Sequence, residues 1–168
     1  MLELWRTISP RWLYLAGALV VLGLIAGALY LQYGLREDPC PLCMVQRVIF
    51  IVIGVLFFCA VIHNAGRVGR WVYSTLIALT ALGGVAVAGR HIWIQHLPKD
   101  QVPACGPGLD FMLANFPMAD VWQELMHGSG ECAAKGWTFL TLGLPEWALL
   151  NFLFLGALAL AIALRKSA

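Results

Sequence analysis

Four long apolar segments limit what this chain can fold into. They span residues about 12–33, 42–62, 71–89 and 146–164, and only Gln32 interrupts the first, near its end. A helix needs about 20 such residues to cross a hydrocarbon core of about 30 Å. Hydrophobic residues form 61% of the 168-residue chain and charged residues 12%, which is more apolar than one soluble core can accommodate. The sequence therefore predicts an all-α membrane protein, a single four-transmembrane-helix bundle over residues 1–168.

Basic residues concentrate on one side of this predicted bundle. The two termini and the connection between the second and third spans carry one acid, Glu3, against Arg6, Arg11, Arg67, Arg70, Arg165 and Lys166. By the positive-inside rule, both termini face the cytoplasm, and a long loop of residues about 90–144 faces outward. A net charge of +2 with no cluster of bases also argues against a nucleic-acid partner.

The first span has a competing interpretation as a cleaved signal peptide. Ala26-Gly27-Ala28 resembles a small-residue cleavage site, but the apolar run before it is long and continues well past it. We therefore expect a membrane helix. Gly23-xxx-Gly27 in this span and Thr80-xxx-Gly84-xxx-Ala88 in the third predict close helix packing.

The long outer loop contains a short amphipathic helix. Its apolar residues are spaced at i, i+3, i+4 and i+7, namely Met118, Val121, Trp122 and Leu125, and Pro117 suits the first helical position. Such a helix either lies on the membrane surface or packs on the bundle. Gly128-Ser129-Gly130 then predicts a flexible break directly before Cys132.

Five cysteines carry the candidate chemistry. Cys59 falls inside the second span, where we expect a small buried hydrophobe. Cys40, Cys43, Cys105 and Cys132 lie on the predicted outer side, where disulfides are the default. Three pairings are possible, and local pairing of Cys40 with Cys43 would leave Cys105 and Cys132 to close a loop. Considered by itself, a Cys105–Cys132 disulfide would be a structural crosslink.

The Cys40-x-x-Cys43 motif points to redox chemistry instead. Pro41 suits the first turn of the second helix, and a helix N-terminus stabilises a thiolate. Arg47 follows on the same predicted face, and a guanidinium at the membrane edge is costly. It is expected either to stabilise a thiolate at Cys43 or to hold a polar ligand. The competing possibility is that Arg47 only reaches outward to the lipid headgroups.

Zinc binding is the main chemical rival. The Cys-x-x-Cys supplies half of a zinc site, and His91, His96 or His127 could complete it. Thiols in an oxidising compartment tend to form disulfides, so we expect no metal. His91 and Gln95 lie four residues apart at the predicted membrane edge, where an imidazole could bind a carbonyl or transfer a proton.

If both cysteine pairs are redox-active, the electrons need an acceptor. No haem ligand pair, flavin fingerprint or nucleotide motif occurs in the sequence, whereas a quinone is dissolved in the bilayer itself. Four spans, Pro39-Cys40-Pro41-Leu42-Cys43 with Arg47, and an outer cysteine pair flanking an amphipathic helix together resemble the DsbB family. Phe116-Pro117, Gly128-Ser129-Gly130-Glu131-Cys132 and Trp137-Thr138-Phe139-Leu140 extend the resemblance over nearly the whole chain.

The resemblance implies a bacterial inner-membrane thiol:quinone oxidoreductase that reoxidises a periplasmic DsbA-type dithiol oxidase, with ubiquinone or menaquinone as electron acceptor. The partner would attack Cys105 and free Cys132, and Cys132 would attack Cys40 and release Cys43. Cys43 would then form a transient adduct or charge-transfer contact with the quinone, aided by Arg47. His91 matches a position near the family's quinone site.

One departure from the family pattern is Gln46, where some relatives have an acid before the arginine. Two other functions remain open. A vitamin K epoxide reductase-like enzyme also combines four helices, a Cys-x-x-Cys and a quinone, but its motif is expected in the final helix. A non-enzymatic scaffold with purely structural disulfides would give Arg47 no role.

Overall fold

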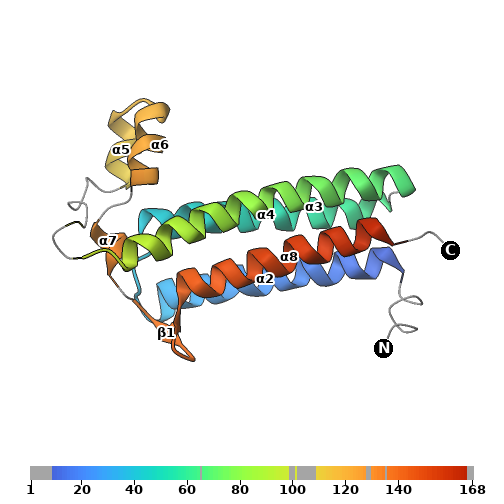
Figure 1. Cartoon of the computed structure of the whole chain (residues 1–168), viewed down its shortest axis with the longest axis horizontal. Coiled ribbons are helices and arrows are strands. Elements are labelled where there is room, and N and C mark those ends of the chain that lie inside the picture. Colours follow the sequence, from blue (N-terminus) through green and yellow to red (C-terminus); the bar gives the residue numbers. More distant parts are fainter. Residues whose placement is uncertain are drawn as a thin grey trace.

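The computed structural model describes residues 9–64, 66–98, 101, 109–127, 130–134 and 136–165. Its long helices are α2 (Pro10–Gly34), α3 (Pro41–His63), α4 (Arg67–Gln95) and α8 (Leu144–Leu164). All four lie along one axis as a bundle (Figure 1), and each is long and apolar enough to cross a membrane. The predicted four-helix membrane bundle is thereby confirmed.

Proline fixes where three of these helices begin. Pro10 and Pro41 are the first residues of α2 and α3, and Pro145 is the second residue of α8. Proline lacks a backbone N–H, which the first turn of a helix does not use, and its fixed φ angle suits that position. Asn64, in the left-handed conformation with φ 42°, ends α3. Figure 1 shows that the start of α2, the end of α3, the start of α4 and the end of α8 lie together at one end of the bundle.

The core of the bundle is aromatic and aliphatic. The rings of Phe50 on α3 and Phe152 on α8 stack with centroids 4.0 Å apart. Gly84 on α4 leaves room for this pair, because a Cβ atom there would lie 2.6 Å from the Phe152 ring. The predicted packing role of Gly84 is thus confirmed. That of Gly23 and Gly27 is wrong: both are exposed, and nothing lies within 4 Å of their missing Cβ positions.

Helix α2 is continuous through Ala26-Gly27-Ala28, the stretch that resembles a cleavage site. It buries Tyr14 and Val21 in the same core cluster as Phe57 of α3. Cleavage at Ala26-Gly27-Ala28 would therefore remove one helix of the bundle. We interpret the first span as a membrane helix that contributes directly to packing.

The third helix is longer than its apolar segment. Residues about 71–89 are the predicted span, whereas α4 runs from Arg67 to Gln95. Hydropathy locates the part of a helix that fits in hydrocarbon, but the hydrogen bonding of the helix continues into the interface, where charged side chains reach water. The extension places His91 on the helix itself.

The connection between α4 and α8 contains three short helices, α5 (Leu109–Asn115), α6 (Met118–His127) and α7 (Gly130–Ala133). Helix α6 is the predicted amphipathic helix, with Pro117 directly before it rather than at its first position. Val121 is buried with Met112 and contacts Val45 of α3, so α6 packs partly on the bundle. The side chains of Trp122 and Leu125 lie outside the described residues, as do Gly128 and Ser129. A location on the membrane surface remains a prediction.

A small hairpin precedes α8. Strand β1 (Thr138–Phe139) pairs antiparallel with β2 (Leu142–Gly143). Leu140 and Thr141 form the turn with φ angles of 51° and 69°. Such two-residue turns usually contain Asn-Gly or Asp-Gly, which is why the sequence gives little sign of this hairpin. The Trp147 indole donates a hydrogen bond to the Phe139 carbonyl (3.1 Å) and ties the hairpin to α8.

The Gly84–Phe152 contact predicts a selective sensitivity to added volume. Gly84→Ala forces a methyl group into the Phe152 ring, and such overpacking costs about 1–3 kcal/mol. We expect a lower midpoint of thermal unfolding for the purified protein in detergent. The matched control is Gly83→Ala, because a Cβ at that neighbouring position meets nothing within 4 Å. Equal midpoints for the two variants would contradict this account of the packing.

Candidate functional site

The site is built on the first turn of α3. Cys40 is the N-cap residue, and the backbone N–H of Cys43 donates to Cys40 Sγ at 3.3 Å. The Cys40 thiol donates to Cys43 Sγ at a distance of 2.9 Å. Cys40 is buried and Cys43 is half-buried. The N-terminus of α3 is the positive end of its helix dipole and favours negative charge. Both sulfurs therefore lie where a thiolate is stabilised.

Helix α7 brings a third cysteine to this turn. Cys132 is completely buried, and α7 lies against the end of α4 (Figure 1). The sulfurs of Cys40 and Cys132 and a ring nitrogen of His91 all lie within 4.8 Å of one another. The Cys132 sulfur therefore lies beside the Cys40 sulfur, and thiol–disulfide exchange begins with one sulfur attacking another.

His91 is held between Cys40 and a glutamine. Its Nε2 lies 3.7 Å from Cys40 Sγ, and its Nδ1 lies 3.2 Å from Gln46 Nε2. The Gln46 amide nitrogen can only donate, so His91 Nδ1 accepts and the ring proton of the neutral imidazole is on Nε2. That proton points to Cys40. Both Gln46 and His91 are buried, so this orientation is fixed within the bundle.

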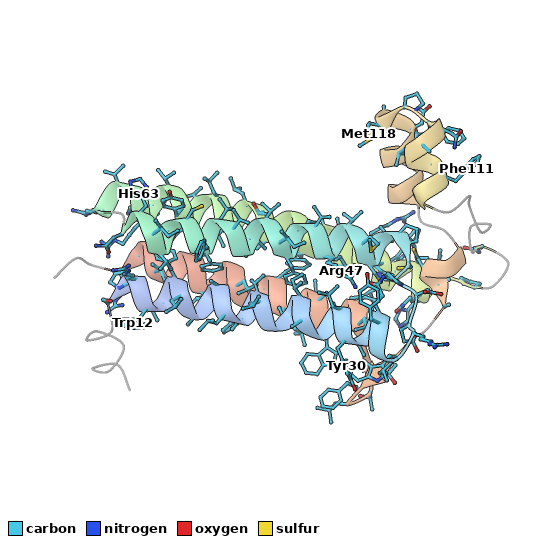
Figure 2. All side chains as sticks on the ribbon, turned by 180° about the vertical axis from the view of Figure 1, so that it is seen from behind. Trp12, Tyr30, Arg47, His63, Phe111 and Met118 are labelled. Atoms are coloured by element: carbon cyan, nitrogen blue, oxygen red, sulfur yellow. The ribbon has the colours of Figure 1, made fainter. Side chains whose placement is uncertain are left out.

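Arg47 reaches from α3 to the neighbouring helix α2 near the cysteine end (Figure 2). Its guanidinium donates to the Gln32 side-chain oxygen at 2.6 Å and to the Ala28 carbonyl at 3.4 Å. These two contacts use part of the five N–H groups of the guanidinium and leave others for a ligand. The polar break that Gln32 makes in the first span thus has a partner, and Arg47 is anchored inside the bundle.

The other residues singled out in the sequence do not belong to this cluster or lie outside the described residues. Cys59 is exposed, so the expectation of a buried side chain is wrong: a membrane helix is apolar on every face, and composition does not tell lipid from core. His96 is exposed and bonded to the Ile92 carbonyl at 2.8 Å, while Gln95 is half-buried. Cys105 lies outside the described residues, as does the His127 side chain.

Two chemistries suit a cluster of Cys40, His91 and Cys132. Two thiolates and an imidazole are zinc ligands, and this donor set differs from the predicted one, which relied on Cys40 with Cys43. The same cluster, with Cys43 beside Cys40, also suits exchange between two disulfides. Geometry alone does not choose between them.

Comparison with known proteins shows which family this chain belongs to. The family model described as "Disulfide bond formation protein DsbB" matches residues 10–162. The chain belongs to the DsbB family. It is therefore a bacterial multi-pass membrane protein with an oxidoreductase role in disulfide bond formation.

Individual DsbB-family relatives match over most of their length. A disulfide bond formation protein B of Methylococcus capsulatus is 43% identical over 152 residues, which are 90% of this chain and 93% of that protein. One of Hahella chejuensis is 47% identical over 146 residues, covering 87% and 88% of the two chains. One of Nitrosococcus oceani is 45% identical over 153 residues, covering 91% and 90%.

The positions of two residues in this candidate site are not evident from the sequence. Gln32 of α2 contacts Arg47 of α3, and Gln46 of α3 contacts His91 of α4. A strongly polar side chain inside an apolar span is the available sign, because it needs a hydrogen-bond partner in the bundle. The identity of that partner depends on helix pairing and rotation.

The His91 contact predicts the reactivity of Cys40. In Cys43→Ser protein that is fully reduced before the assay, so that Cys40 is a free thiol, we expect His91→Phe to slow alkylation of Cys40 about tenfold or more near neutral pH, because a hydrogen bond to a charged group contributes roughly 1.5–3 kcal/mol. Timed alkylation followed by mass spectrometry of the Cys40 peptide measures the rate.

Exposed His96 provides the control for this experiment. His96→Phe is expected to leave the alkylation rate unchanged. The effect of His91→Phe should also vanish at strongly alkaline pH, where the thiol is ionised in both variants. A slowing that persists there would mean that His91 controls access to Cys40 and not its charge.

Proposed function

We propose that this protein reoxidises a periplasmic DsbA-type dithiol oxidase and passes the electrons to a membrane quinone. The observation that carries the proposal is the burial of Cys132 against Cys40, directly beside Cys43. This places a cysteine of the outer connection next to a cysteine pair at the end of a membrane helix. Such an arrangement supports electron transfer from a water-soluble dithiol to a lipid-soluble acceptor.

The first two exchanges run inward along the chain. A partner thiolate attacks Cys105, so that a bond between the partner and Cys105 forms, the Cys105–Cys132 bond breaks, and Cys132 leaves as a thiolate. Cys132 then attacks Cys40. The Cys132–Cys40 bond forms, the Cys40–Cys43 bond breaks, and Cys43 leaves as a thiolate at the α3 N-terminus, where the helix dipole stabilises it.

The remaining exchanges restore the resting cysteines. The partner's second thiolate attacks its own mixed disulfide, which releases the oxidised partner and a Cys105 thiolate. Cys105 attacks Cys132, re-forms their bond and releases Cys40 as a thiolate that the His91 Nε2–H can stabilise. Cys40 and Cys43 then re-form their disulfide as two electrons leave the protein.

The residues around Cys43 fit a quinone as the acceptor. Cys43 is more accessible than Cys40 and Cys132, and Arg47 and His91 offer donors suited to carbonyl oxygens. A bound quinone supplies a carrier for two electrons and two protons. Arg47 would orient a carbonyl and stabilise developing negative charge through the N–H groups that Gln32 and Ala28 leave unused.

The direction of the bundle follows from the charge distribution. The cysteine end is proposed to face the periplasm of an inner membrane, and both termini the cytoplasm, because the arginine-rich connections lie at the opposite end. This places the partner-facing cysteines in the compartment where disulfides form.

Three other functions make different predictions. A zinc site at Cys40, His91 and Cys132 predicts stoichiometric metal in the reduced protein, which elemental analysis would detect. A structural scaffold predicts disulfides indifferent to quinone. A vitamin K epoxide reductase-like enzyme would carry its Cys-x-x-Cys on the last helix, whereas here the motif begins α3.

Removing Cys43 should stop electron flow and trap the relay. We expect Cys43→Ser to abolish quinone reduction by a reduced DsbA-type dithiol, measured by quinone absorbance in detergent. Because Cys132 is then the cysteine beside Cys40 among the described residues, we also expect a Cys40–Cys132 disulfide in non-reducing peptide mapping. Cys59→Ser is the matched control and should keep full turnover. Wild-type turnover in Cys43→Ser would refute the relay.

Arg47 should act on quinone more than on the dithiol partner. Arg47→Gln removes a charged donor, so we expect the KM for quinone to rise roughly tenfold or more while the KM for the dithiol changes little. Gln32→Leu keeps the Arg47 guanidinium but removes the side-chain oxygen that it donates to. We expect a smaller rise in the KM for quinone in this variant. Arg36→Gln, an exposed arginine after α2, is the control. Equal effects on both KM values would contradict this role.

A further inference from the structure

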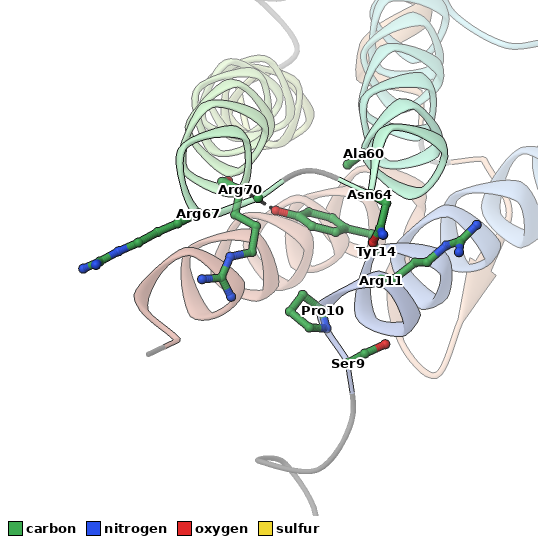
Figure 3. A pocket seen from close by; sticks show the side chains of 9 residues that line it. Ser9, Pro10, Arg11, Tyr14, Ala60, Asn64, Arg67 and Arg70 are labelled. Carbon is green, nitrogen blue, oxygen red and sulfur yellow. Dashed lines mark hydrogen bonds between the residues drawn. The ribbon is translucent and has the colours of Figure 1, made fainter. Parts of the chain in front are cut away.

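A second polar site lies at the opposite end of the bundle from the cysteines. A cavity of about 300 Å³ opens between the start of α2, the end of α3 and the start of α4 (Figure 3). Its lining includes Arg11, Asn64, Arg67 and Arg70, and no acidic residue lines it within the described part of the chain. Nothing in the relay uses this cavity.

Arg70 is the unusual member of this group. Its side chain is only 7% exposed, and within the described residues its guanidinium has neither a hydrogen bond nor an ion pair. Figure 3 shows it reaching from α4 towards Pro10, while Arg11 and Arg67 extend to either side. A buried guanidinium is strongly disfavoured unless an anion accompanies it. The cavity, which Arg70 lines, therefore favours a negative ligand.

The backbone around the cavity reinforces this requirement. Helix α4 begins here, and its N-cap, Gly66, provides no side-chain acceptor for the N–H groups of the first turn. No acid occurs in that turn either. Uncapped N–H groups at the positive end of a long helix bind anions, phosphate above all.

The walls of the cavity are held in place independently of any ligand. The Tyr14 hydroxyl of α2 donates to the Arg70 carbonyl at 3.2 Å and shares a hydrogen bond with the Ser74 hydroxyl at 2.9 Å. These contacts fix the start of α4 against α2. The cavity is thus preorganised, which lowers the cost of binding.

The depth of the cavity indicates where the anion comes from. Trp12 and Trp71 directly follow the lining residues Arg11 and Arg70 in the sequence. They are 64% and 44% exposed, as expected of side chains at the membrane–water interface. Phosphate groups of lipids occupy that level, and basic pockets between membrane helices bind anionic headgroups. The predicted cytoplasmic side of the bundle carries this cavity.

We propose that this cavity binds the phosphate of an anionic phospholipid headgroup. Arg70 and the α4 N–H groups would contact the phosphate oxygens, and Arg11 and Arg67 would close over the headgroup from the sides. The bound lipid would join α2, α3 and α4 at the end of the bundle remote from the cysteines. This site is independent of the proposed electron relay.

Thermal unfolding in a neutral detergent tests the proposal. The additives are dioleoyl phosphatidylglycerol, dioleoyl phosphatidylcholine and inorganic phosphate, each titrated against the full chain. We expect phosphatidylglycerol alone to raise the midpoint, with native mass spectrometry showing a retained lipid. Arg70→Gln should weaken its apparent affinity about tenfold or more, since one charged contact is lost.

Two further variants keep the test decisive. Arg67 is exposed, so Arg67→Gln should fold normally and lose part of the phosphatidylglycerol response. Arg36→Gln, at the cysteine end, should respond as the wild type does. Equal stabilisation by phosphatidylcholine, or an unaltered response in both Arg70→Gln and Arg67→Gln, would overturn the proposal. A matching response to inorganic phosphate would assign the cavity to a free anion instead of a lipid.

Discussion

The absence of water in a bilayer core determines where this chain can place its polar groups. Every polar side chain at that depth needs a partner inside the protein, and the bundle supplies partners near its two ends. At one end Gln46, His91 and Cys40 form a buried chain of contacts, and Gln32 holds Arg47. At the other, Tyr14 and Ser74 tie α2 to α4. The middle is left to ring stacking and aliphatic packing.

The four helices were predictable because hydropathy and length are local properties. Proline at the helix starts and the spacing of Met118 and Val121 are equally local, and they locate the short helix of the outer connection. The burial of Cys59, Gly23 and Gly27 was predicted wrongly for one reason. Lipid and protein core are both apolar, so a side chain's type does not reveal which of them it faces.

Only part of the candidate site could be predicted from the sequence. Cys40, Cys43 and Arg47 share one helix, so their spacing alone brings them together. His91 reaches them because α4 continues beyond its apolar segment, and Cys132 because α7 folds against α4. Those placements depend on packing between segments distant in sequence. Cys105 lies outside the described residues and keeps only its predicted role.

The complete burial of Cys132 has a consequence for selectivity in the cell. Small thiols in solution react with any disulfide they can touch, and a relay open to them would run in futile cycles. A sulfur enclosed by α7 and α4 is hidden from such reagents. Helix α7 is only four residues long, and so short a helix has little stability of its own. In the proposed relay, the burial of Cys132 and the weak local structure of α7 would shield this sulfur from small thiols until a protein partner binds.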